Sequence, residues 1–402
     1  MTLTTKQREI RTKILDKIYV NGPISRIEIS KDTGITPATV SEITGTLLRD
    51  HLIYELGEEC ADHNKSGRKR ILLDIAPGHS FYIGSELSEK YITFCLSDNT
   101  GAIHAEKVIK MESLSNALTE VRYVEELKQF IEDCHSFKPK AVGIALPGHF
   151  NEKSKTIYSN NPLWRKFNLE ILIDHINLPI YFKNNVHCMA NAERLFSKDQ
   201  KDDQFIFFHV GRGMFCSYMY KGQTYGENKF LVGEVGHTIV HPDGELCECG
   251  KRGCLQTYAS EAWIIKKCRI LFENSNTTFL KQLATDQNSI TIGTILQAYK
   301  MGDEGVINIL TKAIKYLSIT INNLPMIIDT NKIILHGELF DEPDLTTLLS
   351  RYLNEDTALH PLSHVWEIVF KSYTEINGAL AGCSLAISSS LVQGRESCTI
   401  QC

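Results

Sequence analysis

The clearest chemistry in this chain belongs to one histidine and three cysteines within an eighteen-residue segment, His237, Cys247, Cys249 and Cys254. An imidazole and three thiolates are the four ligands of a tetrahedral Cys3His zinc site. The Cys-x-Cys-x4-Cys spacing, with the histidine ten residues upstream, is more specific than a lone Cys-x-x-Cys pair. A disulfide is a poor alternative because a Cys-x-Cys pair is too close to bridge comfortably. Buried thiols beside a solvent-facing histidine remain the alternative to the closed structural zinc site that we predict.

The whole chain has the composition of an ordinary globular protein. Its 402 residues are 43% hydrophobic and 23% charged, with a net charge of −5 that gives no general argument for nucleic acid binding. This length predicts two or three domains. The N-terminus lacks the apolar core of a signal peptide, and no run of 18 apolar residues occurs. We therefore expect a cytoplasmic protein whose other cysteines are reduced and mostly fill its core.

Residues 1–76 predict a separate module that begins with three helices. Isoleucines at four-residue steps predict a first helix that ends at residues 21–23. Ser25 and Glu28 form a capping box for a short second helix. Thr36 is a suitable N-cap for a third helix, with Pro37 at its first position. Two capped helices joined by a short turn that contains glycine are typical of a helix-turn-helix.

Two predicted strands, at 52–56 and 70–75, follow these helices and enclose the polar, basic segment 58–69. This order is typical of a winged helix, whose second helix contacts base edges while the wing meets phosphates or the minor groove. The predicted DNA-contacting residues are Thr36, Pro37, Ala38, Thr39, Ser41, Glu42, Thr44, Arg68, Lys69 and Arg70. The alternative is a solvated hairpin on a helical protein-interaction module.

The remainder of the chain predicts two successive α/β blocks. Each block opens with a strand meander and continues with helices and buried strands, which indicates duplicated lobes with a ligand cleft between them. We assign residues 77–190 to a small lobe, completed by a C-terminal helix at 375–391, and residues 191–374 to a large lobe that holds the zinc segment.

The zinc segment also carries a family pattern, E-x-G-H at 234–237 followed by C-x-C-G-x-x-G-C-L at 247–255. This pattern resembles that of the ROK family of repressors, open reading frames and sugar kinases, and the resemblance covers nearly the whole chain. A winged helix ahead of such a body resembles the repressor branch, which includes N-acetylglucosamine and xylose repressors. The resemblance implies an actin-like, sugar-kinase-like two-lobe fold, with zinc held by the histidine and three cysteines named above.

The resemblance further implies an effector site for a sugar, formed by Asn161, Asn184, Asn185, Glu234, His237 and Gln256. The motif around Asn161 is one residue shorter than in the family, and Gln256 replaces a glutamate but can still hydrogen-bond a hydroxyl group. Trp164 leaves two alternatives, a ring that stacks on the sugar or a core side chain. His209 and His241 are expected to be core or loop histidines.

The parts that transfer phosphate in family kinases are altered at four positions. Asn185 stands where the family has the aspartate that accepts the proton of the attacking hydroxyl, and an amide cannot accept it. Glu86 replaces part of the first phosphate loop, and Phe215 replaces a glycine of the second. The third loop is His336-Gly337-Glu338 instead of a glycine run. These changes predict a protein that is not an enzyme.

We therefore expect a sugar-responsive DNA-binding regulator, a repressor of genes for carbohydrate uptake or catabolism. It would bind double-stranded operator DNA as a homodimer or a dimer of dimers, and a sugar or sugar phosphate would close the lobes and change the spacing of the DNA-binding modules. Three alternatives remain: an active ATP-dependent sugar kinase fused to a DNA-binding domain, a switch that responds to zinc, and control by a protein partner.

Overall fold

The computed structural model describes residues 4–57, 70–88, 90–110, 119–159, 161–197, 203–227, 229–355 and 366–395. The chain divides into two compact units, residues 1–202 with 375–402, and residues 203–374. The two units divide at 202/203, whereas the boundary predicted at 190/191 falls inside the continuous helix α7 (Asn185–Phe196). In the described part of the chain, no helix is long and apolar enough to cross a membrane.

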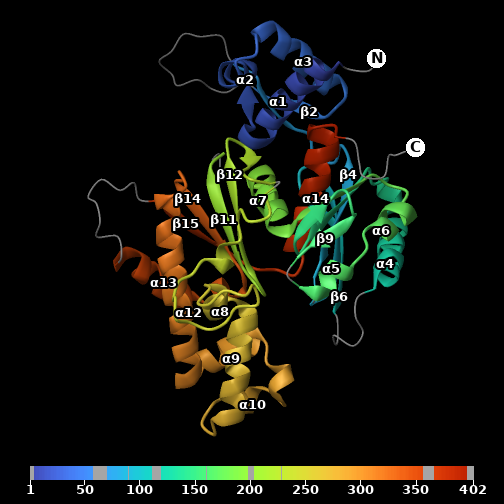
Figure 1. The fold of residues 1–402 in the computed structure, drawn as a ribbon. Coiled ribbons are helices and arrows are strands. Elements are labelled where there is room, and N and C mark those ends of the chain that lie inside the picture. Colours follow the sequence, from blue (N-terminus) through green and yellow to red (C-terminus); the bar gives the residue numbers. More distant parts are fainter. Residues whose placement is uncertain are drawn as a thin grey trace. The chain divides into compact units, whose positions relative to one another are not determined.

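The N-terminal part of the first unit contains three helices and a three-stranded antiparallel sheet (Figure 1). The helices are α1 (Thr5–Asn21), α2 (Arg26–Thr33) and α3 (Pro37–Arg49). The strands follow the order β1 (Ile24–Ser25), β3 (Leu72–Ile75) and β2 (Ile53–Leu56). The predicted wing, 58–69, lies outside the described residues.

The predicted caps of these helices are confirmed. The Ser25 hydroxyl accepts a hydrogen bond from the Glu28 amide, and the Glu28 carboxylate accepts one from the Ser25 amide at 3.0 Å. Gly34, with φ of 68°, ends α2 in the left-handed conformation that favours glycine. The Thr36 hydroxyl then caps α3, whose first residue is Pro37. Local sequence therefore sets the α2–turn–α3 geometry.

The core of this N-terminal module is not built from the module alone. Ile14, Leu15 and Ile18 of α1 are buried with residues of α3 and the sheet. Val392, close to the C-terminal end of the chain, is 2% exposed and belongs to the same cluster. The module's apolar core therefore extends onto the last helix.

The rest of the first unit is a mixed five-stranded sheet covered by helices. The strand order is β10 (Ile180–Asn184), β7 (Val142–Leu146), β4 (Phe81–Leu87), β5 (Tyr91–Asp98) and β6 (Ile103–Lys110). The helices are α4 (Glu120–Asp133), α5 (Pro162–Lys166), α6 (Glu170–His175), α7 and α14 (Asn377–Ala386), and a short hairpin joins β8 (His149–Asn151) to β9 (Thr156–Tyr158).

Glycines let α14 lie directly on the centre of this sheet. A Cβ atom on Gly84 of β4 would collide with the carbonyl of Ala379, and one on Gly143 of β7 with the carbonyl of Gly382. Phe94 points to the opposite face of the sheet, where it packs on Tyr123 of α4. The predicted helix at 375–391 therefore belongs to the first unit, and a π-helical segment, η7 (Ile387–Val392), continues it.

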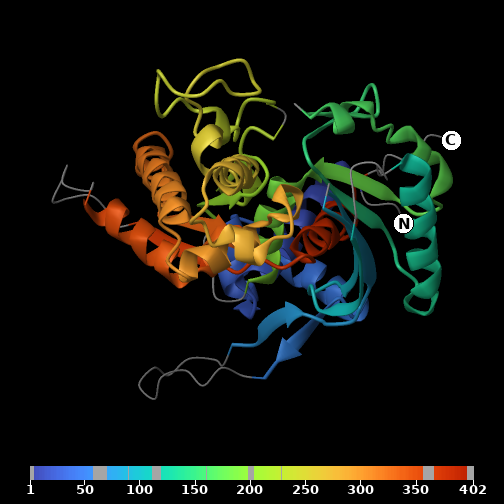
Figure 2. The same ribbon diagram turned by 90° about the horizontal axis from the view of Figure 1, so that it is seen from below.

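The second unit repeats the same sheet topology. Its strand order is β15 (Glu367–Lys371), β14 (Lys332–His336), β11 (Phe205–Val210), β12 (Met214–Tyr220) and β13 (Gln223–Thr224). In both units the central strand pairs with an antiparallel meander on one side. On its other side it pairs with a parallel strand, which in turn pairs with a second parallel strand. The helices are α8 (Gln256–Ala259), α9 (Glu261–Asn274), α10 (Leu280–Leu283), α11 (Ile292–Lys300), α12 (Glu304–Asn323) and α13 (Pro343–Glu355). Figure 2 gives a second view of these elements.

Candidate metal centre and effector-binding residues

A compact loop in the second unit presents the four predicted metal ligands. The amides of Val240 and His241 both donate to the carbonyl of Gly253, at 2.9 and 3.2 Å, and the amide of Cys247 donates to Lys251 at 2.8 Å. Gly253 has φ of 68°, and a Cβ there would collide with the His241 carbonyl. Backbone bonds and an obligatory glycine thus hold distant parts of the loop against one another.

The four ligand atoms fit a tetrahedral ion. They all lie within 4.8 Å of one another. Cys247 Sγ is 3.5 Å from His237 Nδ1, and Cys249 Sγ is 3.6 Å from Cys254 Sγ. Around zinc, bonds of about 2.3 Å to sulfur and about 2.0–2.1 Å to nitrogen give tetrahedral edges of about 3.5–3.8 Å. The sulfur separation is far longer than the S–S bond of about 2.05 Å in a disulfide.

His237 connects the metal ligands to Glu234. Its Nδ1 faces the cysteines, whereas its Nε2 lies 3.9 Å from the Glu234 carboxylate. Burial, followed by the charge of Lys251, lowers the pKa of His237, which favours the neutral imidazole that a metal requires. Burial also raises the pKa of Glu234 to about 7.

Gln256 lies beside the same segment as the first residue of α8. A Cβ on Gly236 would be 3.2 Å from its side-chain oxygen, and Gly236 stands between Glu234 and His237 in the sequence. The second unit therefore brings together the three effector residues predicted within it, Glu234, His237 and Gln256.

In the first unit the predicted effector residues begin helices. Asn184 caps α7, with its Oδ1 accepting from the amides of Val186 and His187 at 2.9 and 3.2 Å, and its Nδ2 donates to Gly148 at 3.4 Å. Asn161 caps α5 by accepting from the Leu163 amide at 3.0 Å. Both side chains therefore cap a helix, a structural role that the family resemblance did not indicate.

Asn185 has a partner that our predicted effector site omitted. Its Nδ2 donates to Glu86 Oε1 at 3.1 Å. Glu86 is half-buried near the carboxyl end of β4, and its other oxygen lies against Gly378 at the start of α14. Burial raises the pKa of Glu86 to about 7, although the bond from Asn185 and the charge of Lys90 lower it. The sequence signal for this contact was the carboxyl group of Glu86, which we interpreted only as a change to a phosphate loop.

Several alternatives from the sequence are decided by burial. Trp164 is 2% exposed, and its ring lies 5.9 Å from that of Phe167 in the core, so the core alternative holds. The Nδ1 atoms of His209 and His336 are 2.9 Å apart on the parallel strands β11 and β14. Phe215 is buried, with its ring against Gly233.

Most of the described residues predicted to contact DNA are exposed, at the N-cap of α3 or in its first turns. Thr36, Pro37, Ala38, Ser41 and Glu42 are exposed, and Thr39 is half-buried with its hydroxyl 2.9 Å from that of Thr36. Arg70 is exposed, with its Nη1 3.7 Å from Glu28 Oε1. Arg68 and Lys69 lie outside the described residues.

Thr44 is a correction to that prediction. It is fully buried, its hydroxyl donates to the Val40 carbonyl at 2.8 Å, and it accepts from Arg26 Nε at 3.0 Å. Our helical pattern placed Thr44 on the exposed face because threonine is polar. The hydrogen bond from Arg26 to Thr44 joins α2 to α3, and Arg26 also binds Glu55 of β2 at 2.9 Å.

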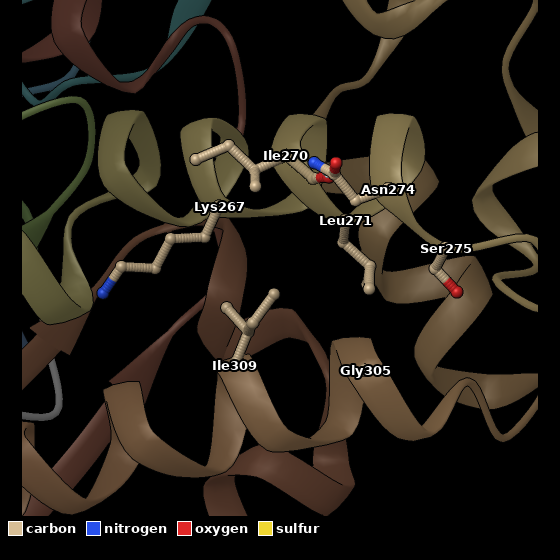
Figure 3. Close-up of a pocket in the computed structure, with 7 residues that line it drawn as sticks. All are labelled: Lys267, Ile270, Leu271, Asn274, Ser275, Gly305 and Ile309. Carbon is tan, nitrogen blue, oxygen red and sulfur yellow. The ribbon is translucent and has the colours of Figure 1, made fainter.

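A cavity of about 480 Å³ lies elsewhere in the second unit, between α9 and α12 (Figure 3). Its lining is Lys267, Ile270, Leu271, Asn274, Ser275, Gly305 and Ile309. The lining is largely apolar and includes none of the predicted effector residues. We assign it no function.

Comparison with known proteins identifies relatives across the chain. The ROK family model matches residues 82–388. A xylose repressor of Bacillus subtilis is 24% identical over 93% of this chain and 94% of its own length. The transcriptional dual regulator NagC of Escherichia coli is 27% identical over 79% of this chain and 77% of its own length.

Solved structures show the same fold. A ROK family transcriptional regulator, a homologue of the E. coli MLC protein, has a TM-score of 0.76 at 22% identity and covers 97% of both chains. A ROK family glucokinase from Streptomyces griseus, solved with glucose and AMPPNP, has a TM-score of 0.66 at 20% identity. It covers 76% of this chain and 99% of its own.

Proposed function

The chain belongs to the ROK family, and on that premise we propose that it is a sugar-responsive, DNA-binding transcriptional repressor. The observation that carries the proposal is the module ahead of the family region, which begins at residue 82. The kinase structure covers 76% of this chain, whereas the regulator structure covers 97%. The relatives that match almost the whole chain, over 93% and 97% of its length, are named as a xylose repressor and a transcriptional regulator.

The N-terminal module has the features of a winged helix that binds DNA. The α2–turn–α3 pair is followed by antiparallel strands, and the exposed N-terminal end of α3 carries Thr36, Ala38 and Ser41. These small side chains allow the helix to approach base edges closely in the major groove. Arg70, together with Arg68 and Lys69, would supply phosphate contacts from the wing.

The body serves as a sensor without catalysing phosphate transfer. A kinase needs a general base at the sugar hydroxyl, and the amide of Asn185 is bound to Glu86 at 3.1 Å instead. A carboxyl group at Glu86 also disfavours nucleotide phosphates nearby. The effector residues are Asn161, Asn184 and Asn185 in the first unit and Glu234, His237 and Gln256 in the second. Their amide, carboxylate and imidazole groups are suited to sugar hydroxyls.

The metal centre is a structural zinc site. Four protein ligands would occupy all four coordination positions of a tetrahedral zinc ion and leave none for a catalytic water. The ion would fix the loop that presents Glu234 and His237 to the effector. We further propose a homodimer or a dimer of dimers, because paired winged helices gain affinity on a two-part operator.

Selection from random DNA with the full-length protein tests this proposal. We expect enrichment of one sequence with two half-sites, and loss of its binding in Ser41→Arg, which places a bulky side chain at the end of α3 that meets the bases. If the selection enriches no particular sequence, the proposal of a sequence-specific repressor is overturned. Incubation with ATP and D-xylose, D-glucose or N-acetylglucosamine distinguishes the kinase alternative, which predicts ADP release stimulated by one of the sugars.

A further inference from the structure

Two helices of the first unit begin beside the same carboxyl group. Asn185, the first residue of α7, donates to Glu86 at 3.1 Å. Gly378, in the first turn of α14, lies against the other Glu86 oxygen, where even a Cβ atom would not fit. Residues in the first turns of α7 and α14 therefore both contact the side chain of Glu86.

The far ends of the same two helices contact α1 of the DNA-binding module. The Nη1 and Nη2 atoms of Arg194, on α7, donate to the two carboxylate oxygens of Asp16, each at 2.7 Å. The segment that continues α14 accepts a bond from Arg11 at the Leu391 carbonyl, 3.2 Å, and one from Thr12 at the Val392 carbonyl, 3.0 Å. Every one of these contacts lies within the first unit.

The two helices are joined along their length. Asn191 of α7 donates to both the carbonyl and the hydroxyl of Ser384 on α14, each at 3.1 Å, and to the Ser388 hydroxyl at 3.2 Å. The Ser384 hydroxyl binds the Cys188 carbonyl in return, at 3.2 Å. A helix rises about 1.5 Å per residue, so residue 185 and residue 194 are about 14 Å apart along the axis of α7. Hydrogen-bond networks and rigid helices carry energetic coupling between distant sites.

We propose that α7 and α14 form a lever that transmits the state of the Glu86–Asn185 pair to the DNA-binding module through the Arg194–Asp16 ion pair. The inference rests on the proposed function, because it assigns a transmission route to the same effector site. A ligand at Asn184 and Asn185 competes for the amide that Glu86 now binds. Loss of that bond frees the carboxyl group that touches both helix starts, and the joined helices carry the shift to α1.

The form of the two contacts suits such a role. The Arg194 side chain is 5% exposed and pairs through both Nη atoms, and this bidentate geometry restricts the orientation of α1. The Glu86 end is a single hydrogen bond between a carboxyl and an amide, which a polar ligand can replace at little cost. A lever between two sites requires a strong contact where it acts, here Arg194–Asp16, and an exchangeable contact where the ligand binds, here Glu86–Asn185.

A double-mutant cycle tests the lever without knowledge of the natural sugar. Asn185→Asp removes the amide donor and puts a second carboxyl group about 3 Å from Glu86. Two carboxyl groups this close cannot both ionise, so the substitution changes the protonation and the bonding of this pair. Arg194→Met removes the output contact but keeps an unbranched apolar side chain. Asp32→Asn is the matched control, since it removes an ion pair of similar length, 2.9 Å to Lys17, that lies inside the module.

The readouts are the Kd for the selected DNA and the hydrogen exchange of the α1 amides. We expect Asn185→Asp to change the Kd at least tenfold and α1 exchange at least threefold in the wild-type and Asp32→Asn backgrounds. In the Arg194→Met background both changes should fall below twofold. If Asn185→Asp does not fold, Glu86→Gln takes its place in the same cycle.

The outcomes separate the lever from the proposed function. Equal effects of Asn185→Asp with and without Arg194, or no effect in either background, would overturn the lever while leaving sequence-selective DNA binding intact. If the wild-type protein selects no DNA sequence, the proposed function fails, and α1 exchange alone decides whether the two ends communicate.

Discussion

The Arg194–Asp16 ion pair should respond unequally to removal of its two partners. The Arg194 side chain is 5% exposed, whereas that of Asp16 is 35% exposed. Asp16→Ala leaves a buried guanidinium without its carboxylate partner, which costs about 3–5 kcal/mol. Arg194→Met leaves a carboxylate that water can reach, and its apolar replacement can fill the site. We therefore expect a smaller cost of about 1–2 kcal/mol for Arg194→Met.

The assay is urea unfolding of the full chain, followed by far-UV circular dichroism, together with exchange of the α1 amides as a local probe. Each variant's free energy of unfolding is compared with that of Asp32→Asn, whose partly exposed pair should contribute at most about 1 kcal/mol. We predict the order Asp16→Ala, then Arg194→Met, then Asp32→Asn, from most to least destabilised. An equal loss for Asp16→Ala and Arg194→Met would refute the argument from burial.

Three further predictions concern the effector unit, the metal and the helix pair. Burial holds the pKa of Glu86 near 7, against an ordinary 4.5; the folded state thus keeps a proton that the unfolded state loses, and stability falls as pH rises through this window. Between pH 5 and 8, the free energy of unfolding of Glu86→Gln should therefore rise relative to that of the wild type by up to about 3 kcal/mol, as measured by urea unfolding. A difference between the two proteins that does not change with pH would contradict this. Cys249→Ser should lower the zinc content, measured by mass spectrometry, from one ion per chain and lower the melting temperature; unchanged content would exclude the Cys3His site. Thr44→Ala should destabilise the chain by about 1 kcal/mol without changing the selected DNA sequence, whereas Glu42→Ala should change that sequence or its affinity.

The parts of this protein that local sequence specifies were predicted well. The capping box of Ser25 and Glu28 and the Thr36 cap depend on residues three apart, so their geometry follows from the sequence. The clustering of His237, Cys247, Cys249 and Cys254 also follows from local sequence, because one short glycine-rich loop brings their side chains together. Strand and helix periodicity was likewise enough to predict both α/β blocks.

The errors arose where distant segments decide the outcome. Thr44 is polar and was placed on the exposed face of its helix, but Arg26 from α2 supplies a buried partner for its hydroxyl. The bond between Glu86 and Asn185 joins residues 99 positions apart, which no periodicity encodes. Val392 enters the core of a module that begins near residue 4, because α14 crosses the sheet on glycines and ends against α1.

In the proposed function, a sugar bound by the body weakens the binding of the protein to DNA. Fluorescence anisotropy of the labelled, selected DNA measures this directly, with the full-length zinc-loaded protein and a panel that includes D-xylose, N-acetylglucosamine, D-glucose and their phosphates. We predict that at least one sugar weakens DNA binding tenfold or more, with no consumption of ATP. An unchanged Kd with every sugar, or ATP turnover with one of them, would contradict it.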